Sequence, residues 1–118
     1  MSLRLDAPET EAEFQQAVIE LARTLGYAVA HFRPAKTSKG WRTPVAADGK
    51  GWPDLAIVGR GRIIYAELKS ARGKLSPEQQ EWLDRLERAG GESYVWRPED
   101  FDQIVSVLTG KAIRGTAA

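Results

Sequence analysis

The stretch GWPDLAIVGRGRIIYAELKS, residues 51–70, predicts two short strands joined by a glycine-rich turn. Apolar and β-branched residues fill both arms, as is typical of strands, and the Gly-Arg-Gly-Arg segment at 59–62 suits a tight hairpin turn. Three charged residues interrupt these arms. Asp54 opens the first arm, and Glu67 and Lys69 lie near the end of the second. Charged side chains at such positions require a chemical reason.

The turn suggests how the two arms pair. If Val58 pairs with Ile63, Asp54 lies directly opposite Glu67 on one face of the sheet. Lys69 follows Glu67 by two residues and points to the same face. Two opposed carboxylates repel each other, and a divalent cation offsets that cost, because Mg²⁺ prefers oxygen ligands. The register therefore favours a hydrolytic metal site for a phosphodiester, with a lysine that orients water or neutralises charge on phosphorus.

The same residues also have a purely structural interpretation. Glu67 and Lys69 could form a salt bridge at a hairpin edge, while Asp54 caps a turn after Pro53. We favour the metal site, because the two acids align across the strands and a proline precedes Asp54.

Composition narrows the class of protein. The chain has 118 residues, which suits one domain with one core. It has no cysteine, which excludes disulfides and thiolate metal sites, and its single histidine, His31, argues against a histidine-rich zinc site. The first 14 residues, MSLRLDAPETEAEF, lack the apolar segment of a signal peptide, and nothing has the length of a membrane span. We therefore expect a cytoplasmic protein.

The net charge of +1 hides an uneven distribution. Residues 33–74 carry ten basic and three acidic side chains, whereas acidic side chains predominate before and after them. The basic segment contains the suspected site, so we expect a local positive surface that faces a polyanion.

A long connection at residues 33–51 is expected to be functional, since structureless loops of this length are uncommon in small domains. Its basic residues can offset phosphate charge, and its tryptophan can stack on an unpaired base. The alternative is a solvated loop pinned by a buried tryptophan. The predicted DNA-binding residues are Lys36, Lys39, Trp41, Arg42 and Lys50 from this connection, with Arg72 and Lys74 after the hairpin.

Two helices have clear start signals. Thr10 is the expected N-cap of the first helix, which ends before Gly26, and Glu11 lies in its first turn. Glu11 could complement the helix dipole or approach the acidic pair of the hairpin. Ser76 is the expected N-cap of the second helix, and Gln79 completes a capping box.

The element order is helix, three strands, helix, strand and a C-terminal helix, which predicts an α/β fold with a mixed sheet flanked by helices. The strands outside the hairpin are expected at 27–32 and 92–98, and the last helix follows the second of them. The predicted domain spans residues 10–110, between an N-terminal extension at 1–9 and a disordered tail at 111–118.

The residues of the predicted metal site resemble the signature of a known protein family. The PD at 53–54 followed by the ELK at 67–69 resembles the PD-(D/E)xK nuclease signature, in a matching αβββαβ element order. The finer pattern is similar to the VRR-NUC family, the virus-type replication-repair nucleases. The blocks that carry it are TEAEFQ, LGYAVAHF, GKGWPDL, AELKS, KLSPEQ, WL and AGGESYVWRPED, which together cover residues 10 to about 108.

The resemblance implies a role for each matching residue. Asp54, Glu67 and the carbonyl of Leu68 would bind Mg²⁺ or Mn²⁺, and Lys69 would position or activate water. Glu11 matches the helix-borne acid of the family and would act on the metal directly or through water. Gln79 matches a glutamine that would orient the lysine or a phosphate, and its capping-box role stays open as an alternative.

The resemblance also implies a reaction. Short family members resemble phage and bacterial homodimers that cut branched DNA, particularly four-way (Holliday) junctions. It therefore implies a metal-dependent endodeoxyribonuclease that acts on branched DNA as a homodimer. Two alternatives stay open: a flap, nicking or restriction-like nuclease of the same fold, and a non-catalytic DNA-binding subunit.

Overall fold

The computed structural model describes residues 10–32, 35–38, 40–42 and 46–110; side chains are described throughout these ranges except at 35–37 and 41–42. Two helices, α1 and α2, have the predicted N-caps, and a short 3-10 turn, η1, precedes the last helix, α3. The elements in chain order are α1 Glu11–Thr24, β1 Ala28–His31, β2 Ala35–Thr37, β3 Gly40–Arg42, β4 Leu55–Gly59, β5 Arg62–Leu68, α2 Pro77–Arg88, β6 Glu92–Trp96, η1 Pro98–Asp100 and α3 Phe101–Thr109.

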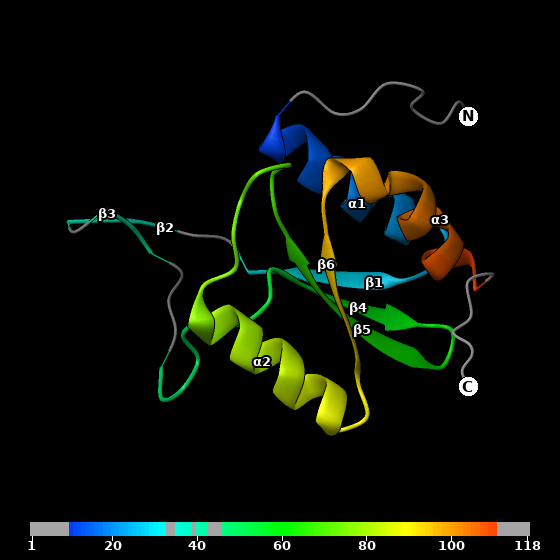
Figure 1. Cartoon of the computed structure of the whole chain (residues 1–118). Helices are drawn as coiled ribbons and strands as arrows, with labels where there is room; N and C mark the ends of the chain where they lie inside the picture. The colour runs from blue at the N-terminus through cyan, green and yellow to red at the C-terminus, as the bar shows by residue number, and fades with distance from the viewer. Residues whose placement is uncertain (1–9, 33–34, 39, 43–45, 111–118) are drawn as a thin grey trace.

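The main sheet has four strands in the order β1-β4-β5-β6. The first three pair antiparallel, and β6 joins β5 in parallel after the crossover through α2. Helices α1 and α3 cover one face of this sheet, and α2 lies on the other (Figure 1). The predicted mixed sheet flanked by helices, with a C-terminal helix, is therefore confirmed.

The core lies between the sheet and the pair α1 and α3. Alternate residues of β4 and β5 point into it, which is the pattern expected when one face of a strand is buried. Helices α1 and α3 contribute their apolar stripes, which follow the helical period. The buried members are Phe14, Val18, Ala22, Tyr27, Leu55, Ile57, Ile64, Ala66, Leu68, Trp96, Ile104, Val107 and Leu108.

The predicted hairpin register is confirmed. Val58 pairs with Ile63, and the ladder continues to Leu55 opposite Ala66. The two turn residues, Arg60 and Gly61, have φ values of 53° and 73°, as a type I′ hairpin turn requires. Such a φ is unfavourable for arginine, but hydrogen bonds from its guanidinium to the carbonyls of Leu25, Leu108 and Thr109 anchor the turn.

An aromatic cluster attaches α2 to its face of the sheet. The Trp52 ring makes edge-on contacts with Phe32, Tyr65 and Trp82, with centroid separations of 6.2, 5.6 and 5.0 Å. These rings come from the end of β1, from β5 and from α2. Trp52 stands two residues before Asp54, so the cluster fixes the backbone that leads into the predicted site.

The connection at 33–51 differs from the expectation of an irregular loop. It contains β2 and β3, which pair antiparallel as a separate two-stranded sheet. This small sheet projects away from the layered body (Figure 1). The three-residue strands are too short for their periodicity to be recognised in the sequence.

Residues 1–9 and 111–118 lie outside the described residues, so the predicted domain boundaries stay a prediction. Among the described residues, no helix has the length and apolar character needed to cross a membrane.

Candidate active site

The candidate site lies where β4 begins and β5 ends, on the face that carries α2. Asp54 immediately precedes β4, and its carbonyl accepts a hydrogen bond of 2.8 Å from the Phe32 amide. The β4–β5 ladder ends with Leu55 opposite Ala66, and one residue further along, Asp54 lies opposite Glu67. The sequence-based alignment of these two acids is therefore confirmed, because their carboxyl groups interact directly.

Hydrogen bonds orient both acids. Oδ2 of Asp54 accepts a bond of 2.9 Å from the backbone N–H of Leu68. Glu67 is only 2% exposed, and its Oε2 accepts a bond of 2.9 Å from Nε2 of Gln79. Nζ of Lys69 lies 3.7 Å from the same oxygen. No described protein group donates a hydrogen bond to the buried Oε1 of Glu67, which is costly unless this oxygen carries a proton or binds a cation.

Burial controls the charge of the pair. Loss of solvation, followed by the charge of Asp54, raises the pKa of Glu67 from 4.5 to about 8, although Lys69 opposes this shift. Burial also raises the pKa of Asp54, against the Leu68 hydrogen bond. Two opposed carboxyls do not both ionise readily, so the raised pKa of Glu67 favours the neutral form of this residue in the metal-free protein.

Gln79 has two roles at once. Its Oε1 accepts a hydrogen bond of 2.9 Å from the Ser76 amide, while its backbone N–H donates to Oγ of Ser76 at 3.1 Å. These bonds form the predicted capping box of α2. Because the cap uses the amide oxygen, the amide nitrogen is directed at Glu67. The predicted cap is therefore present, while the family-derived role of Gln79 in orienting the lysine or a phosphate stays a prediction.

Residues 33–100, more than half of the chain, match the VRR-NUC domain family. The chain belongs to the VRR-NUC domain family. It is therefore a nuclease of the PD-(D/E)xK type, and the family predicted from the PD and ELK blocks is confirmed.

Solved structures agree with this assignment. A chain described as a VRR_NUC domain is 23% identical, with a TM-score of 0.61 over 81% of this chain and 94% of that one. A VRR_NUC domain protein is 25% identical, with a TM-score of 0.60 over 92% of this chain and 96% of that one. At this identity the first shows the shared fold alone. None of the curated proteins matches this chain.

The VRR-NUC domain does not gather Glu11 with the acidic pair. Glu11 is exposed in the first turn of α1, where it can complement the helix dipole. Among the described residues, no three His, Cys, Asp or Glu side chains form a group that could hold a metal ion. The family-derived role of Glu11 therefore stays a prediction.

His31 is a site residue that sequence reasoning missed. It pairs with Leu55 at the edge of the sheet and lies near enough to Asp54 to oppose in small part the rise that burial causes in the pKa of that carboxyl. The sequence offers no signal for this proximity, since the pairing of β1 with β4 joins segments more than 20 residues apart.

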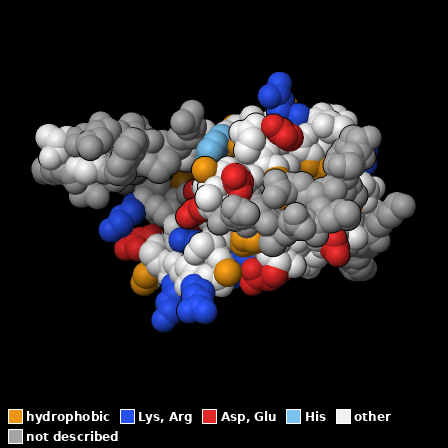
Figure 2. Space-filling model, turned by 90° about the horizontal axis from the view of Figure 1, so that it is seen from above, with side chains coloured by type: hydrophobic (Ala, Val, Ile, Leu, Met, Phe, Trp, Pro, Cys, Tyr) orange, Lys and Arg blue, Asp and Glu red, His pale blue; other side chains and the backbone are white. Residues whose placement is uncertain are grey.

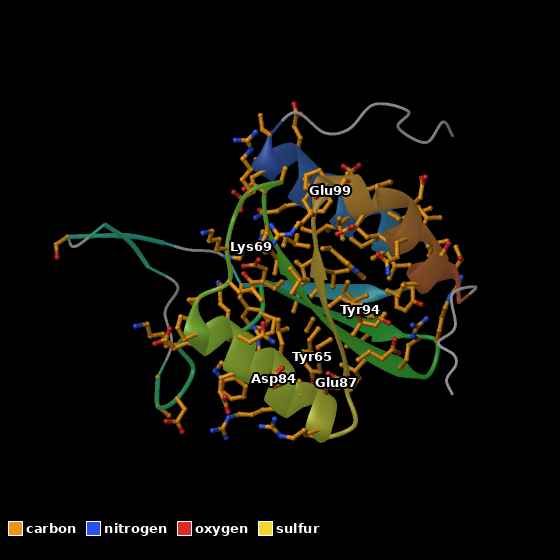
Figure 3. The ribbon with its side chains drawn as sticks, in the orientation of Figure 1. Tyr65, Lys69, Asp84, Glu87, Tyr94 and Glu99 are labelled. Atoms are coloured by element: carbon orange, nitrogen blue, oxygen red, sulfur yellow. The ribbon has the colours of Figure 1, made fainter. Side chains whose placement is uncertain are left out.

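The predicted DNA-binding residues lie in two places. Arg72 and Lys74 are exposed on the connection from β5 to α2. Lys69 is on the same connection and lies on the side of the molecule from which β2 and β3 project (Figure 3). Lys50 is also exposed, and its Nζ lies 3.7 Å from Glu78. The remaining four predicted contacts fall where side chains are not described: Lys36, Lys39, Trp41 and Arg42. On the face drawn in Figure 2, described basic side chains are interspersed with acidic ones.

Proposed function

We propose that this VRR-NUC domain is a Mg²⁺- or Mn²⁺-dependent endonuclease that hydrolyses phosphodiesters in branched DNA, as a Holliday-junction resolvase does. One observation carries the catalytic part of the proposal. One oxygen of Glu67 contacts Gln79 and Lys69, and the other is buried and receives no hydrogen bond from a donor group among the described residues. A buried, opposed pair of carboxyls beside an ammonium group suits a hydrolytic cation site.

The residues present fit a divalent cation. Oε1 of Glu67 lacks a partner, and the neighbouring Asp54 carboxyl supplies a second hard oxygen. We propose that Asp54, Glu67 and the Leu68 carbonyl hold the ion, with Glu11 acting directly or through water. When bound, the ion would lower the pKa of a water molecule and screen charge on the phosphate.

The protein groups around the pair orient the reactants. The Leu68 amide and the Gln79 amide each fix one carboxylate oxygen, which determines how the two acids face each other. Nζ of Lys69 lies 3.7 Å from Oε2 of Glu67, and we propose that it positions the attacking water or neutralises a phosphate oxygen. Its side chain is 18% exposed, so the ammonium is partly desolvated and can interact more strongly with the substrate.

The DNA contacts and the assembly rest on the sequence and the family resemblance. We propose that the connection at 33–51, with Arg72 and Lys74, binds the DNA backbone. We also propose a cytoplasmic homodimer, of bacterial or phage origin, in which two sites meet a branched substrate of matching symmetry. Light scattering at micromolar protein should then give twice the 13.1 kDa chain mass. A monomer that makes paired symmetric cuts would contradict the dimer.

The deciding experiment is a cleavage assay on junction, flap, nicked and linear DNA, each with Mg²⁺, with Mn²⁺ and with EDTA. We expect metal-dependent cutting, strongest on junctions. Stronger cutting of flaps or nicked DNA would overturn the proposed substrate but support the proposed metal-dependent hydrolysis. Binding without cutting in every metal would indicate a non-catalytic DNA-binding subunit.

A further inference from the structure

Lys69 follows the last residue of β5, so contacts outside the strand ladder must fix the position of its side chain. It opens the connection between β5 and α2, and only its amide bonds to β6, through the carbonyl of Trp96 at 3.0 Å. Beyond it the chain turns at residues 70–73, where the Gly73 amide donates to the Ser70 carbonyl at 3.2 Å. The next regular element is α2, which begins after Ser76.

The side chain of Lys69 packs against this turn. A Cβ added at Gly73 would come 3.4 Å from Cδ of Lys69 and 3.1 Å from Oγ of Ser70. The absence of a side chain at Gly73 thus leaves room for the lysine stem. The position of the Lys69 ammonium group, 3.7 Å from Glu67, therefore depends on the position of the turn.

Arg97 fastens that turn to the end of β6. Its Nη1 donates to the carbonyl of Ser70 at 2.8 Å and to the carbonyl of Gly73 at 2.6 Å. The two acceptors are the first and last residues of the turn. The Arg97 backbone is itself held, because its amide donates to Oδ2 of Asp100 at 2.9 Å. One side chain thus links the turn beside Lys69 to a braced segment after β6.

We propose that Arg97 is a positioning residue that holds the Ser70–Gly73 turn and thereby places the Lys69 ammonium group at Glu67. The proposal rests on the proposed nuclease function of Lys69. Charge-assisted hydrogen bonds to two carbonyls suit this task, because they are stronger than neutral ones and fix both ends of the turn. A misplaced catalytic group lowers the rate of reaction even when the fold survives.

The first test follows the turn itself and needs no cleavage. Amide hydrogen exchange at Gly73, and tryptic cutting after Lys69, Arg72 and Lys74, should both be faster in Arg97→Ala than in the wild-type protein. Arg85→Ala is the matched control, because it removes the same charge from an exposed pair with Glu81. Unchanged exchange and proteolysis in Arg97→Ala would overturn the proposal that Arg97 holds the Ser70–Gly73 turn.

The second test links the turn to the reaction by a double-mutant cycle. We expect Arg97→Ala to lower kcat at least 10-fold with KM for DNA within about twofold. Lys69→Ala and the Lys69→Ala/Arg97→Ala double variant should have equal residual rates, since Arg97 acts only through Lys69. Gly73→Ala should also lower kcat, because its added Cβ would crowd Oγ of Ser70 and the side chain of Lys69.

Other outcomes would overturn the proposal. An additive loss in the double variant would show that Arg97 acts independently of Lys69. A raised KM with a salt slope reduced by about one would identify Arg97 as a phosphate contact. A rate loss that follows only the fraction of unfolded protein would leave a purely structural role. If the wild-type protein cuts no DNA, the proposed nuclease function fails and Arg97 has no catalytic effect. The exchange data would still show whether Arg97 holds the Ser70–Gly73 turn.

Discussion

Nε2 of Gln79 lies 2.9 Å from Oε2 of Glu67, and within the described part of the chain no group donates a hydrogen bond to Oε1 of the same carboxyl. The amide that ends the capping box of α2 is thus also the group that orients the buried acid. The start of α2 and the carboxyl that we propose as a cation ligand thus depend on one side chain. Substitutions at Ser76 and Gln79 can separate these two contributions.

Gln79→Glu should damage the site and spare the cap. A glutamate keeps an oxygen for the Ser76 amide but directs a second carboxylate oxygen at Glu67. We expect cleavage to fall by roughly 10- to 100-fold, as for other residues that orient metal ligands. Ser76→Ala is the converse variant, with a loss of about 0.5–2 kcal/mol in the free energy of unfolding. Equal effects of the two variants on cleavage would show that the contribution of Gln79 to the site cannot be separated from its contribution to the helix cap.

Asp54→Asn should abolish Mg²⁺-dependent cleavage, with a loss of roughly 100-fold or more. It removes one charge of an opposed pair, so the melting temperature without metal should stay equal or rise, and most of the Mg²⁺-dependent increase should vanish. Junction binding should survive, because the proposed DNA contacts lie elsewhere. Wild-type cleavage by Asp54→Asn would refute the metal site.

Asp54→Ala is the companion variant. It leaves the Leu68 N–H without its acceptor, which should cost about 1–3 kcal/mol in unfolding free energy. Denaturant unfolding of both variants separates the charge effect from the hydrogen-bond effect.

The stability of the metal-free protein should fall as pH rises from about 4.5 to about 8. The folded-state pKa of Glu67 is raised from 4.5 to about 8, so the folded protein retains a proton that the unfolded chain releases over this window. Below the window both states bind the proton, and above it neither does. Denaturant unfolding in EDTA across this range measures the slope. Glu67→Gln should flatten it, and an undiminished slope in that variant would contradict the assignment.

Gly51→Ala should weaken the contact between α2 and the segment before Asp54. An added Cβ would lie 2.6–2.8 Å from atoms of Glu78 and Gln79, and φ at Gly51 is +88°. Gly26→Ala is the matched control, because its φ is +97° but nothing lies within 4 Å of the added Cβ. Backbone strain should cost each variant about 1–3 kcal/mol, and Gly51→Ala should lose more stability and also lose cleavage. Equal losses would show that the contact with α2 is unimportant.

The combined substitution of Lys36, Lys39 and Arg42 by Ala should weaken DNA binding and flatten its salt dependence. Each lost phosphate contact reduces the log–log slope by about 0.9 on duplex DNA. Binding titrations from low to moderate salt measure that slope. An unchanged slope would mean that the connection at 33–51 does not contact the DNA backbone.

The sequence by itself determined the features that depend on neighbours along the chain. The turn at Arg60 and Gly61 set the hairpin register, and this register aligned Asp54 with Glu67. The helix caps at Thr10 and Ser76 were equally local, since each bonds a residue three positions away. Periodicity and turn chemistry are readable in sequence, because they depend on spacings of two to four residues.

Only the tertiary structure decided which distant groups meet. The sequence left Gln79 as a helix cap or as a residue that orients the lysine or a phosphate. The packing of α2 beside β5 keeps the cap and places the side-chain amide against Glu67. It gave no sign that Arg97 bonds the turn after Lys69, or that His31 lies near Asp54. It also suggested that the first helix could bring Glu11 to the acids, whereas Glu11 is exposed. These relationships arise from strand order and helix placement, which bring together side chains from segments that no local pattern connects.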